Sequence, residues 1–152
     1  MNHRVRWPGI LLRIAGLGLL MAAGGAGLQA AEPMVVVPIE EARFEPVDPG
    51  QPEGPQIAVL WGDPAEGPSA ILLKIGKGEG PLHYHSSDYH LALLQGEMKH
   101  WAEGAHAEEA AVLRPGSYWF QPGGQAHAGS CLTEECVMFV NWSDRRDGVL
   151  AE

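Results

Sequence analysis

The feature that most constrains the fold of this sequence is the alternation of short apolar runs with turns rich in glycine and proline. After residue 30, no stretch of about ten or more residues has the 3.6-residue apolar period of a helix. Many short strands joined by such turns are typical of sandwiches and barrels, so we predict an all-β fold. The predicted strands are Gln56–Trp61, Ser69–Ile75, Tyr89–Gln95, Glu97–Trp101, Ala110–Leu113, Ser117–Gln121 and Cys136–Trp142.

The segment from Glu32 to Pro55 contains six prolines. Proline breaks helices and removes a hydrogen-bond donor, so any strands here belong at sheet edges. We expect short extended pieces at Met34–Ile39 and Ala42–Val47. Such a segment can pair with another copy of the chain as an added strand, and we therefore predict a homodimer.

The first 30 residues have the pattern of a secretory signal peptide. Basic residues come first, and an uncharged run of 15 residues from Ile14 to Leu28 ends in small residues. That run is shorter than the roughly 20 residues that cross a membrane. We predict that residues 1–30 are removed and that residues 31–152 form a single domain, periplasmic or secreted and without a membrane anchor.

The charge of the chain excludes one class of partner. The full sequence has a formal net charge of −9, and loss of Arg4, Arg6 and Arg13 leaves 7 basic against 19 acidic residues. Because this charge repels phosphate backbones, we predict no nucleic-acid partner.

Two stretches concentrate the histidines. In the first, His83 and His85 are two residues apart, and a strand turns such a pair to the same face. The second reads G-S-Y-W-F-Q-P-G-G-Q-A-H, which is typical of a strand, a tight Pro-Gly turn and a returning strand. This hairpin is expected to bring His127 back toward the first pair.

The two stretches resemble the two motifs of the cupin superfamily, G-x5-H-x-H-x3/4-E-x6-G and G-x5-P-x-G-x2-H-x3-N. The wording H-Y-H-S-S-D-Y-H and F-V-N-W-S-D-R-R-D-G also resembles a small uncharacterised family of single-domain cupins. The resemblance implies a small jelly-roll β-barrel, in agreement with the strand pattern. The matching positions are His83, His85 and Gly96 in the first motif, with its opening glycine displaced to Gly76 or Gly78, and Gly116, Pro122, Gly124 and His127 in the second, with Cys131 in place of the final Asn.

The usual glutamate ligand of the first motif is absent. Spacing places Tyr89 or His90 there, and the two point to opposite faces of a strand unless a bulge intervenes. We predict a bulge that turns His90 inward as a fourth ligand, because imidazole binds metal more readily than a phenol. Tyr89 is the alternative fourth ligand or an acid/base group. Asp88 is expected to orient a ligand imidazole or to cap the turn.

Neutral imidazoles that converge inside a barrel suit one divalent transition-metal ion, which could be Zn, Fe, Cu, Ni or Mn. The alternative is that His83, His85 and His127 are hydrogen-bonded core residues of a cupin without metal. Because this fold serves many functions, two remain open. One is a metal-binding or small-ligand-binding module; the other is a metal-dependent enzyme, a dioxygenase or an isomerase, that acts on a small oxygenated substrate. The sequence assigns no catalytic residue.

Cys131 and Cys136 bracket L-T-E-E, which we interpret as a hairpin tip. In an oxidising compartment we predict a disulfide between them, and the alternative is two separate thiols. His100, on the strand after Gly96, is an additional ligand candidate. The pair Arg145–Arg146 lies among acidic residues and is typical of a solvated tail.

Overall fold

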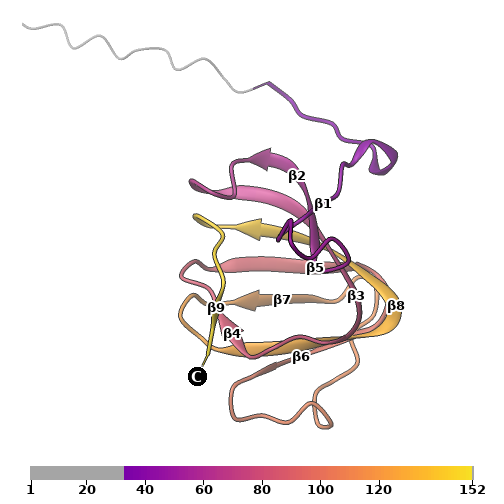
Figure 1. Cartoon of the computed structure of the whole chain (residues 1–152), viewed down its shortest axis with the longest axis vertical. Helices are drawn as coiled ribbons and strands as arrows, with labels where there is room; N and C mark the ends of the chain where they lie inside the picture. Colours follow the sequence, from indigo (N-terminus) through magenta and orange to yellow (C-terminus); the bar gives the residue numbers. More distant parts are fainter. Residues whose placement is uncertain (1–32, 152) are drawn as a thin grey trace, which may run out of the picture. The chain divides into compact units, whose positions relative to one another are not determined.

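The computed structural model describes residues 33–151, and the predicted signal peptide lies outside the described residues (Figure 1). The strands belong to one compact unit that begins at Met34. Among the described residues there is no α-helix, and no helix is long and apolar enough to cross a membrane. The elements are η1 (Ile39–Glu41), β1 (Glu45–Pro46), β2 (Gln56–Gly62), β3 (Ser69–Glu79), β4 (His83–Tyr84), β5 (Tyr89–Gln95), β6 (Met98–Ala102), β7 (Tyr118–Gln121), β8 (His127–Trp142) and β9 (Val149–Leu150).

All pairings in the sheet are antiparallel, and the long strand β8 organises them. Strand β3 follows one edge of β8, while the other edge is shared by β6 along its first part and β5 along its second. Strands β2 and β1 extend the sheet beyond β3, β7 pairs with β5, and β4 pairs with both β8 and β9. The sheet curls, and Figure 1 shows β8 and β3 bending together around one side of it. This is the jelly-roll type of half-barrel, so the predicted fold class is confirmed.

Strand β8 bends where the disulfide lies. Opposite β3 its register passes from Glu135 directly to Cys131, so that the intervening residues bulge out of the ladder. The predicted disulfide between Cys131 and Cys136 is present, with the two Cα atoms 5.9 Å apart. Our interpretation of this segment as a hairpin tip is wrong, because one strand continues through it. The disulfide therefore fixes a bulge within a single strand.

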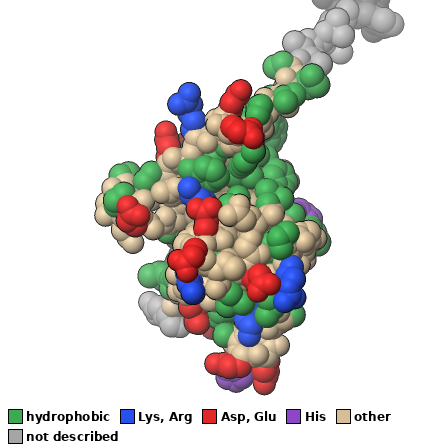
Figure 2. All heavy atoms as spheres, turned by 90° about the vertical axis from the view of Figure 1, so that its right-hand side faces the viewer, with side chains coloured by type: hydrophobic (Ala, Val, Ile, Leu, Met, Phe, Trp, Pro, Cys, Tyr) green, Lys and Arg blue, Asp and Glu red, His purple; other side chains and the backbone are tan. Residues whose placement is uncertain are grey.

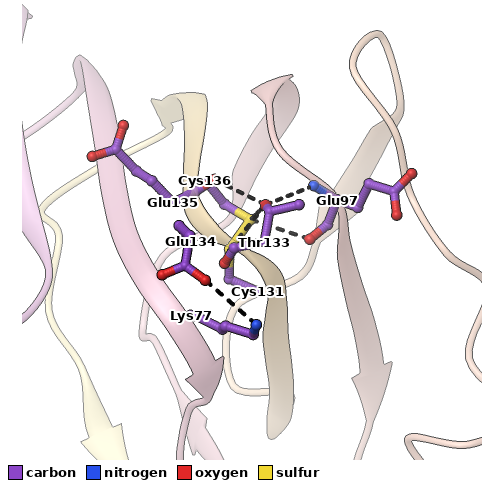
Figure 3. A network of polar contacts seen from close by, with 7 residues as sticks. All are labelled: Lys77, Glu97, Cys131, Thr133, Glu134, Glu135 and Cys136. Carbon is purple, nitrogen blue, oxygen red and sulfur yellow. Dashed lines mark hydrogen bonds and ion pairs between the residues drawn. A yellow bond between two sulfur atoms is a disulfide. The ribbon is translucent and has the colours of Figure 1, made fainter.

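The turn between β5 and β6 packs directly on this bulge (Figure 3). The backbone N–H of Glu97 donates to the Thr133 hydroxyl at 3.2 Å, and the Leu132 N–H donates to the Glu97 carbonyl at 2.8 Å. At Gly96 the φ angle is +86°, and an added Cβ would lie 2.5 Å from the Glu135 carbonyl oxygen. Only glycine fits there, which explains the last glycine of the first motif.

The inner face of the sheet holds the core. On β5 the side chains of Tyr89, Leu91 and Leu93 alternate inward and are buried, as their spacing before Gly96 indicates. They pack against Met138 on β8 and its neighbours. The β5–β8 register shows no shift between Tyr89 and Leu93. The bulge that we predicted before His90 is therefore absent, and this strand keeps simple alternation.

Most predicted strands are present, but several differ in extent; the strand predicted at Cys136–Trp142 begins at His127. Residues 110–113 do not form a strand; only Leu113 makes an isolated bridge, to Met98 of β6. Strand β3 runs on to Glu79, beyond the predicted end at Ile75, because the first part of β8 continues to offer it partners. The short strand β9 near the chain's C-terminal end was not predicted at all.

Candidate metal centre

Three imidazoles meet at the start of β8. His83 on β4 lies directly opposite His127, the first residue of β8, and His85 follows immediately after β4. Their potential ligand nitrogens all lie within 4.8 Å of one another. The ring centroid of His83 is 4.5 Å from that of His127 and 4.9 Å from that of His85. The structure thus brings His83, His85 and His127 together, as the spacing of the two motifs predicts.

Each of the three rings is oriented by a main-chain carbonyl. The Nδ1 atom of His83 lies 2.8 Å from the Pro81 oxygen, and that of His127 lies 2.9 Å from the Gln125 oxygen. The Nδ1 atom of His85 makes a short hydrogen bond to the carbonyl oxygen of Asp147. Because a carbonyl oxygen only accepts, each Nδ1 must carry the proton. Every Nε2 then carries a lone pair and no proton.

Burial keeps two of these rings neutral. It lowers the pKa of His85 from 6.5 to about 4, although the hydrogen bond to Asp147 opposes the change. Burial likewise lowers the pKa of His127 to about 4, again against its carbonyl hydrogen bond. Neighbouring imidazoles lower both values further, because two cations in a confined space repel each other. At neutral pH both rings are in the form that binds metal.

Tyr89, and not His90, occupies the position beside the cluster. The Tyr89 hydroxyl lies 3.2 Å from Nε2 of His127, and burial raises the pKa of Tyr89 to about 12, so the phenol is neutral and donates. His90 is on the opposite, exposed face, where its Nδ1 is 2.6 Å from the Tyr118 hydroxyl. The predicted placement of His90 is wrong because the strand carries no bulge. The alternative residue, Tyr89, faces the histidines.

The cluster opens into a cavity of about 760 Å³. Pockets of roughly 300–1,000 Å³ are typical for small organic ligands. The three histidines and Tyr89 line it, and most of the remaining wall is apolar, including Leu73, Ile75, Trp119 and Met138. The site therefore combines imidazole ligands with space for an organic molecule.

A family model described as "Domain of unknown function (DUF4437)" matches residues 29–150. The chain belongs to the DUF4437 family. A search of the curated proteins found none that matches this DUF4437 chain.

Solved structures show the fold of this DUF4437 chain independently. KdgF from Halomonas sp. has 22% identity and a TM-score of 0.56 over 74% of this chain and 96% of its own. An RmlC-like cupin from Shewanella frigidimarina has 21% identity and a TM-score of 0.56 over 70% and 87%. The polyketide cyclase RemF from Streptomyces resistomycificus has 20% identity and a TM-score of 0.60 over 78% and 86%. The chain thus shares the fold of these cupins, as the motif resemblance implied.

Asp88 supports the site through a turn. Its carboxylate accepts a 2.7 Å hydrogen bond from the Gly123 N–H, and it contacts none of the three imidazoles in the described residues. The Asp88 carboxylate therefore neither orients a ligand ring nor caps its own turn, although we had expected one of the two; it binds the Pro-Gly turn of the second motif. A Cβ on Gly123 would lie 2.4 Å from the Ser86 carbonyl oxygen, and the Gly124 N–H donates to the His85 carbonyl at 2.7 Å. The loops of the two motifs are thus bonded to each other.

The segment from Ser143 to Ala151 completes the site, and sequence reasoning missed it. The carbonyl of Asp147 holds His85, and its carboxylate accepts hydrogen bonds from the Ser86 N–H at 2.8 Å and the Ser86 hydroxyl at 2.6 Å. These two bonds lower the pKa of the Asp147 carboxyl. Our interpretation of the pair Arg145–Arg146 as a solvated tail is therefore wrong for Arg146, which is half-buried, while Arg145 is exposed. Only the family resemblance, which extends to Gly148, could have indicated the importance of this segment.

His100 on β6 borders the cluster without joining it. Its Nε2 lies 3.0 Å from the Gln121 side-chain oxygen, and its ring stacks on Trp119 with centroids 4.8 Å apart. Burial lowers the pKa of His100 as well. It lines the cavity as a neutral polar wall residue.

Proposed function

We propose that this protein is an exported cupin that binds one divalent transition-metal ion through His83, His85 and His127. The observation that carries the proposal is the common orientation of the rings. All three Nδ1 atoms face main-chain carbonyls, so three Nε2 lone pairs converge. Imidazole ligands suit Zn, Fe, Cu, Ni and Mn alike, so the identity of the metal is the first quantity to measure.

The donor set also fits such an ion chemically. The three ligands are uncharged, so a bound ion would keep its positive charge and leave coordination positions open toward the cavity, where it could polarise an oxygen atom of a ligand. The neutral Tyr89 hydroxyl lies at the same place and can donate a hydrogen bond to such an oxygen. We propose on this basis that the protein is a binding module for the metal and a small oxygen-containing molecule.

Metal analysis of the purified protein tests the site. We expect about one transition-metal ion per chain in the parent, and a loss of affinity of tenfold or more in His83→Ala and in His127→Ala, since one bond of three is removed in each. His90→Ala is the matched control, because it removes an exposed imidazole from the other face of the same sheet and should bind metal as the parent does. Unchanged binding in the first two variants would show that the ion, if any, lies elsewhere.

A metal-dependent enzyme, a dioxygenase or an isomerase acting on a small oxygenated substrate, is the second candidate. The favouring observation is Tyr89, whose neutral hydroxyl is placed to give a proton or a hydrogen bond beside the ligand nitrogens. Among proteins of the same fold, RemF is named a polyketide cyclase. Turnover of a diketone or sugar by the metal-loaded protein, lost in Tyr89→Phe with metal content retained, would establish an enzyme. Absence of turnover with every diketone and sugar tested would favour the binding module.

Export to the periplasm or medium is supported by the composition of residues 1–30 and by the disulfide. A disulfide between Cys131 and Cys136 persists in an oxidising compartment and is uncommon in the cytosol. Fractionation of cells that express the full chain should find the protein outside the cytoplasm, shortened by about the length of the signal peptide. Full-length protein retained in the cytoplasm would contradict export.

We also propose a homodimer. Apolar side chains in the segment from Met34 to Ile39 stay exposed, with 88% of Met34 and 73% of Val36 accessible. Figure 2 shows hydrophobic side chains gathered on the upper part of one face, above a region where acidic and basic side chains are interspersed. A second copy that pairs with this segment would remove that apolar surface from water. Light scattering that finds only monomer at high concentration would end the proposal.

A further inference from the structure

Arg146 stands in the wall of the same cavity as the three histidines. It is half-buried, and it also borders a smaller hollow of about 340 Å³ that Val47 and Ile57 help to line. Its positive charge reaches the imidazole of His85, whose pKa it helps to lower. The wall of the cavity therefore carries the positive charge of Arg146 close to the histidines.

No carboxylate lies within ion-pair distance of this cation in residues 33–151, although Asp147 is close enough to raise its pKa. The ion pairs there are Lys74–Glu135, Lys77–Glu134 and Arg114–Glu97. The adjacent carboxylate, Asp147, is engaged by the N–H and hydroxyl of Ser86. Burial lowers the pKa of Arg146, yet a guanidinium keeps its proton in a protein. A partly desolvated charge that is offset only by a nearby carboxylate already bonded to Ser86 is unfavourable, and an anionic ligand would relieve that cost.

The main chain around Arg146 is fixed on both sides. Its N–H donates to the Pro64 carbonyl at 2.8 Å, and the Ser87 hydroxyl donates to the Arg145 carbonyl at 2.8 Å. The carboxylate of Asp147 is tied to Ser86, as described above. Because the segment is already ordered, a ligand would not have to meet the entropic cost of ordering it.

We propose that Arg146 binds the carboxylate of a small organic ligand whose body occupies the cavity beside the histidines. The fork of a guanidinium matches the two oxygens of a carboxylate. The cavity lining also contains the acidic residues Asp48, Glu53 and Glu79 and one further cation, Lys77. These carboxylates repel any anion, but they repel a singly charged carboxylate less than a phosphate dianion. The apolar wall at Leu73 and Met138 suits a hydrocarbon body.

This inference deepens the proposed function, since it names the ligand class of the same cavity. The test measures binding of hexanoate and phenylacetate by calorimetry, each beside its uncharged primary amide, with inorganic phosphate as a third arm. The proteins are the parent, Arg146→Gln, Arg146→Lys and the matched control Arg145→Gln, which removes an exposed charge one residue away. Metal content and thermal unfolding are recorded for every protein.

We expect at least one of the two carboxylates to bind the parent at millimolar concentration or tighter, and about tenfold more tightly than its amide or than phosphate. Arg146→Gln should lose that preference, Arg146→Lys should keep part of it because the charge remains, and Arg145→Gln should match the parent.

Four results would overturn the inference: neither carboxylate binds the parent, the amide or phosphate binds as tightly, Arg146→Gln binds the carboxylate as tightly as the parent, or Arg145→Gln and Arg146→Gln lose binding equally. Metal content separates this failure from failure of the proposed function. Arg146→Gln with parental metal content but undiminished carboxylate binding refutes only the role of Arg146. A parent without metal that still binds carboxylate through Arg146 refutes only the metal site.

Discussion

Acid should destabilise the metal-free protein because two buried imidazoles, His85 and His127, take up protons on unfolding. Only 8% of His85 and 2% of His127 is exposed, and the pKa of each is about 4 in the folded state against 6.5 when free. Between these values the unfolded chain binds more protons than the folded one. The stability that neutral rings contribute is therefore complete above pH 6.5 and is lost as the pH falls toward 4.

The size of this loss follows from linkage. Between pH 7 and pH 5, a pKa that is 2.5 units lower in the folded state decreases the free energy of unfolding by about 2 kcal/mol per group. The cavity is open to water and the two rings lie next to each other, so we expect about 2 to 3 kcal/mol for the pair. Carboxyl groups whose pKa is lowered by hydrogen bonds, such as Asp147, change the free energy of unfolding only at pH values below the range from 7 to 5.

Urea unfolding in the presence of a chelator, followed by tryptophan fluorescence at pH 7, 6 and 5, measures the effect. His127→Gln should lose up to about half of the pH dependence, because a neutral amide replaces one titrating ring while His85, and His100 whose pKa burial also lowers, still titrate. The control His90→Gln, on the exposed face, should keep the full dependence. Equal unfolding free energies at pH 7 and pH 5, or an undiminished slope in His127→Gln, would refute the reasoning.

Three further outcomes are expected. The non-reduced protein should have a mass lower by two hydrogens than the reduced one, and replacement of Cys131 and Cys136 by alanine should lower the unfolding free energy by about 2 kcal/mol in a chemical denaturation series; two titratable thiols would contradict this. Asp147→Asn should weaken metal binding by about tenfold, since it loosens the loop that holds a ligand ring, whereas Asp144→Asn should leave a calorimetric titration unchanged. Gly123→Ala should lower the midpoint of thermal unfolding, because the added Cβ would lie 2.4 Å from the Ser86 carbonyl oxygen. A midpoint equal to that of the parent would show that the turn can shift to accept the methyl group.

Local pattern was sufficient for much of the fold. The bounds of β5, Tyr89–Gln95, are those predicted, because alternating apolar residues before a turn glycine define both the strand and its inward face. The three histidines could be predicted as a cluster because the spacing within each of the two motifs is local as well. Chemistry alone misled us at His90, since ligand preference carries no information about which face of a strand a residue occupies.

What the sequence could not supply depends on distant contacts. The bond from His85 to Asp147 joins residues 62 apart, and nothing near Asp147 distinguishes it from a solvated acidic residue. The continuation of β8 through its bulge depends on partners from β3 and β6, which no local period encodes. Strand β9 is two residues long and exists because β4 provides an edge for it.

The order in which the ribosome makes this chain bears on when the metal site can exist. His83 and His85 emerge early, His127 follows more than forty residues later, and the carbonyl of Asp147 that orients His85 comes later still. A nascent chain therefore offers at most isolated imidazoles, which hold metal weakly. The arrangement of the three histidines is complete only once the last of these residues has docked, so the proposed ion would be selected in the compartment where folding finishes.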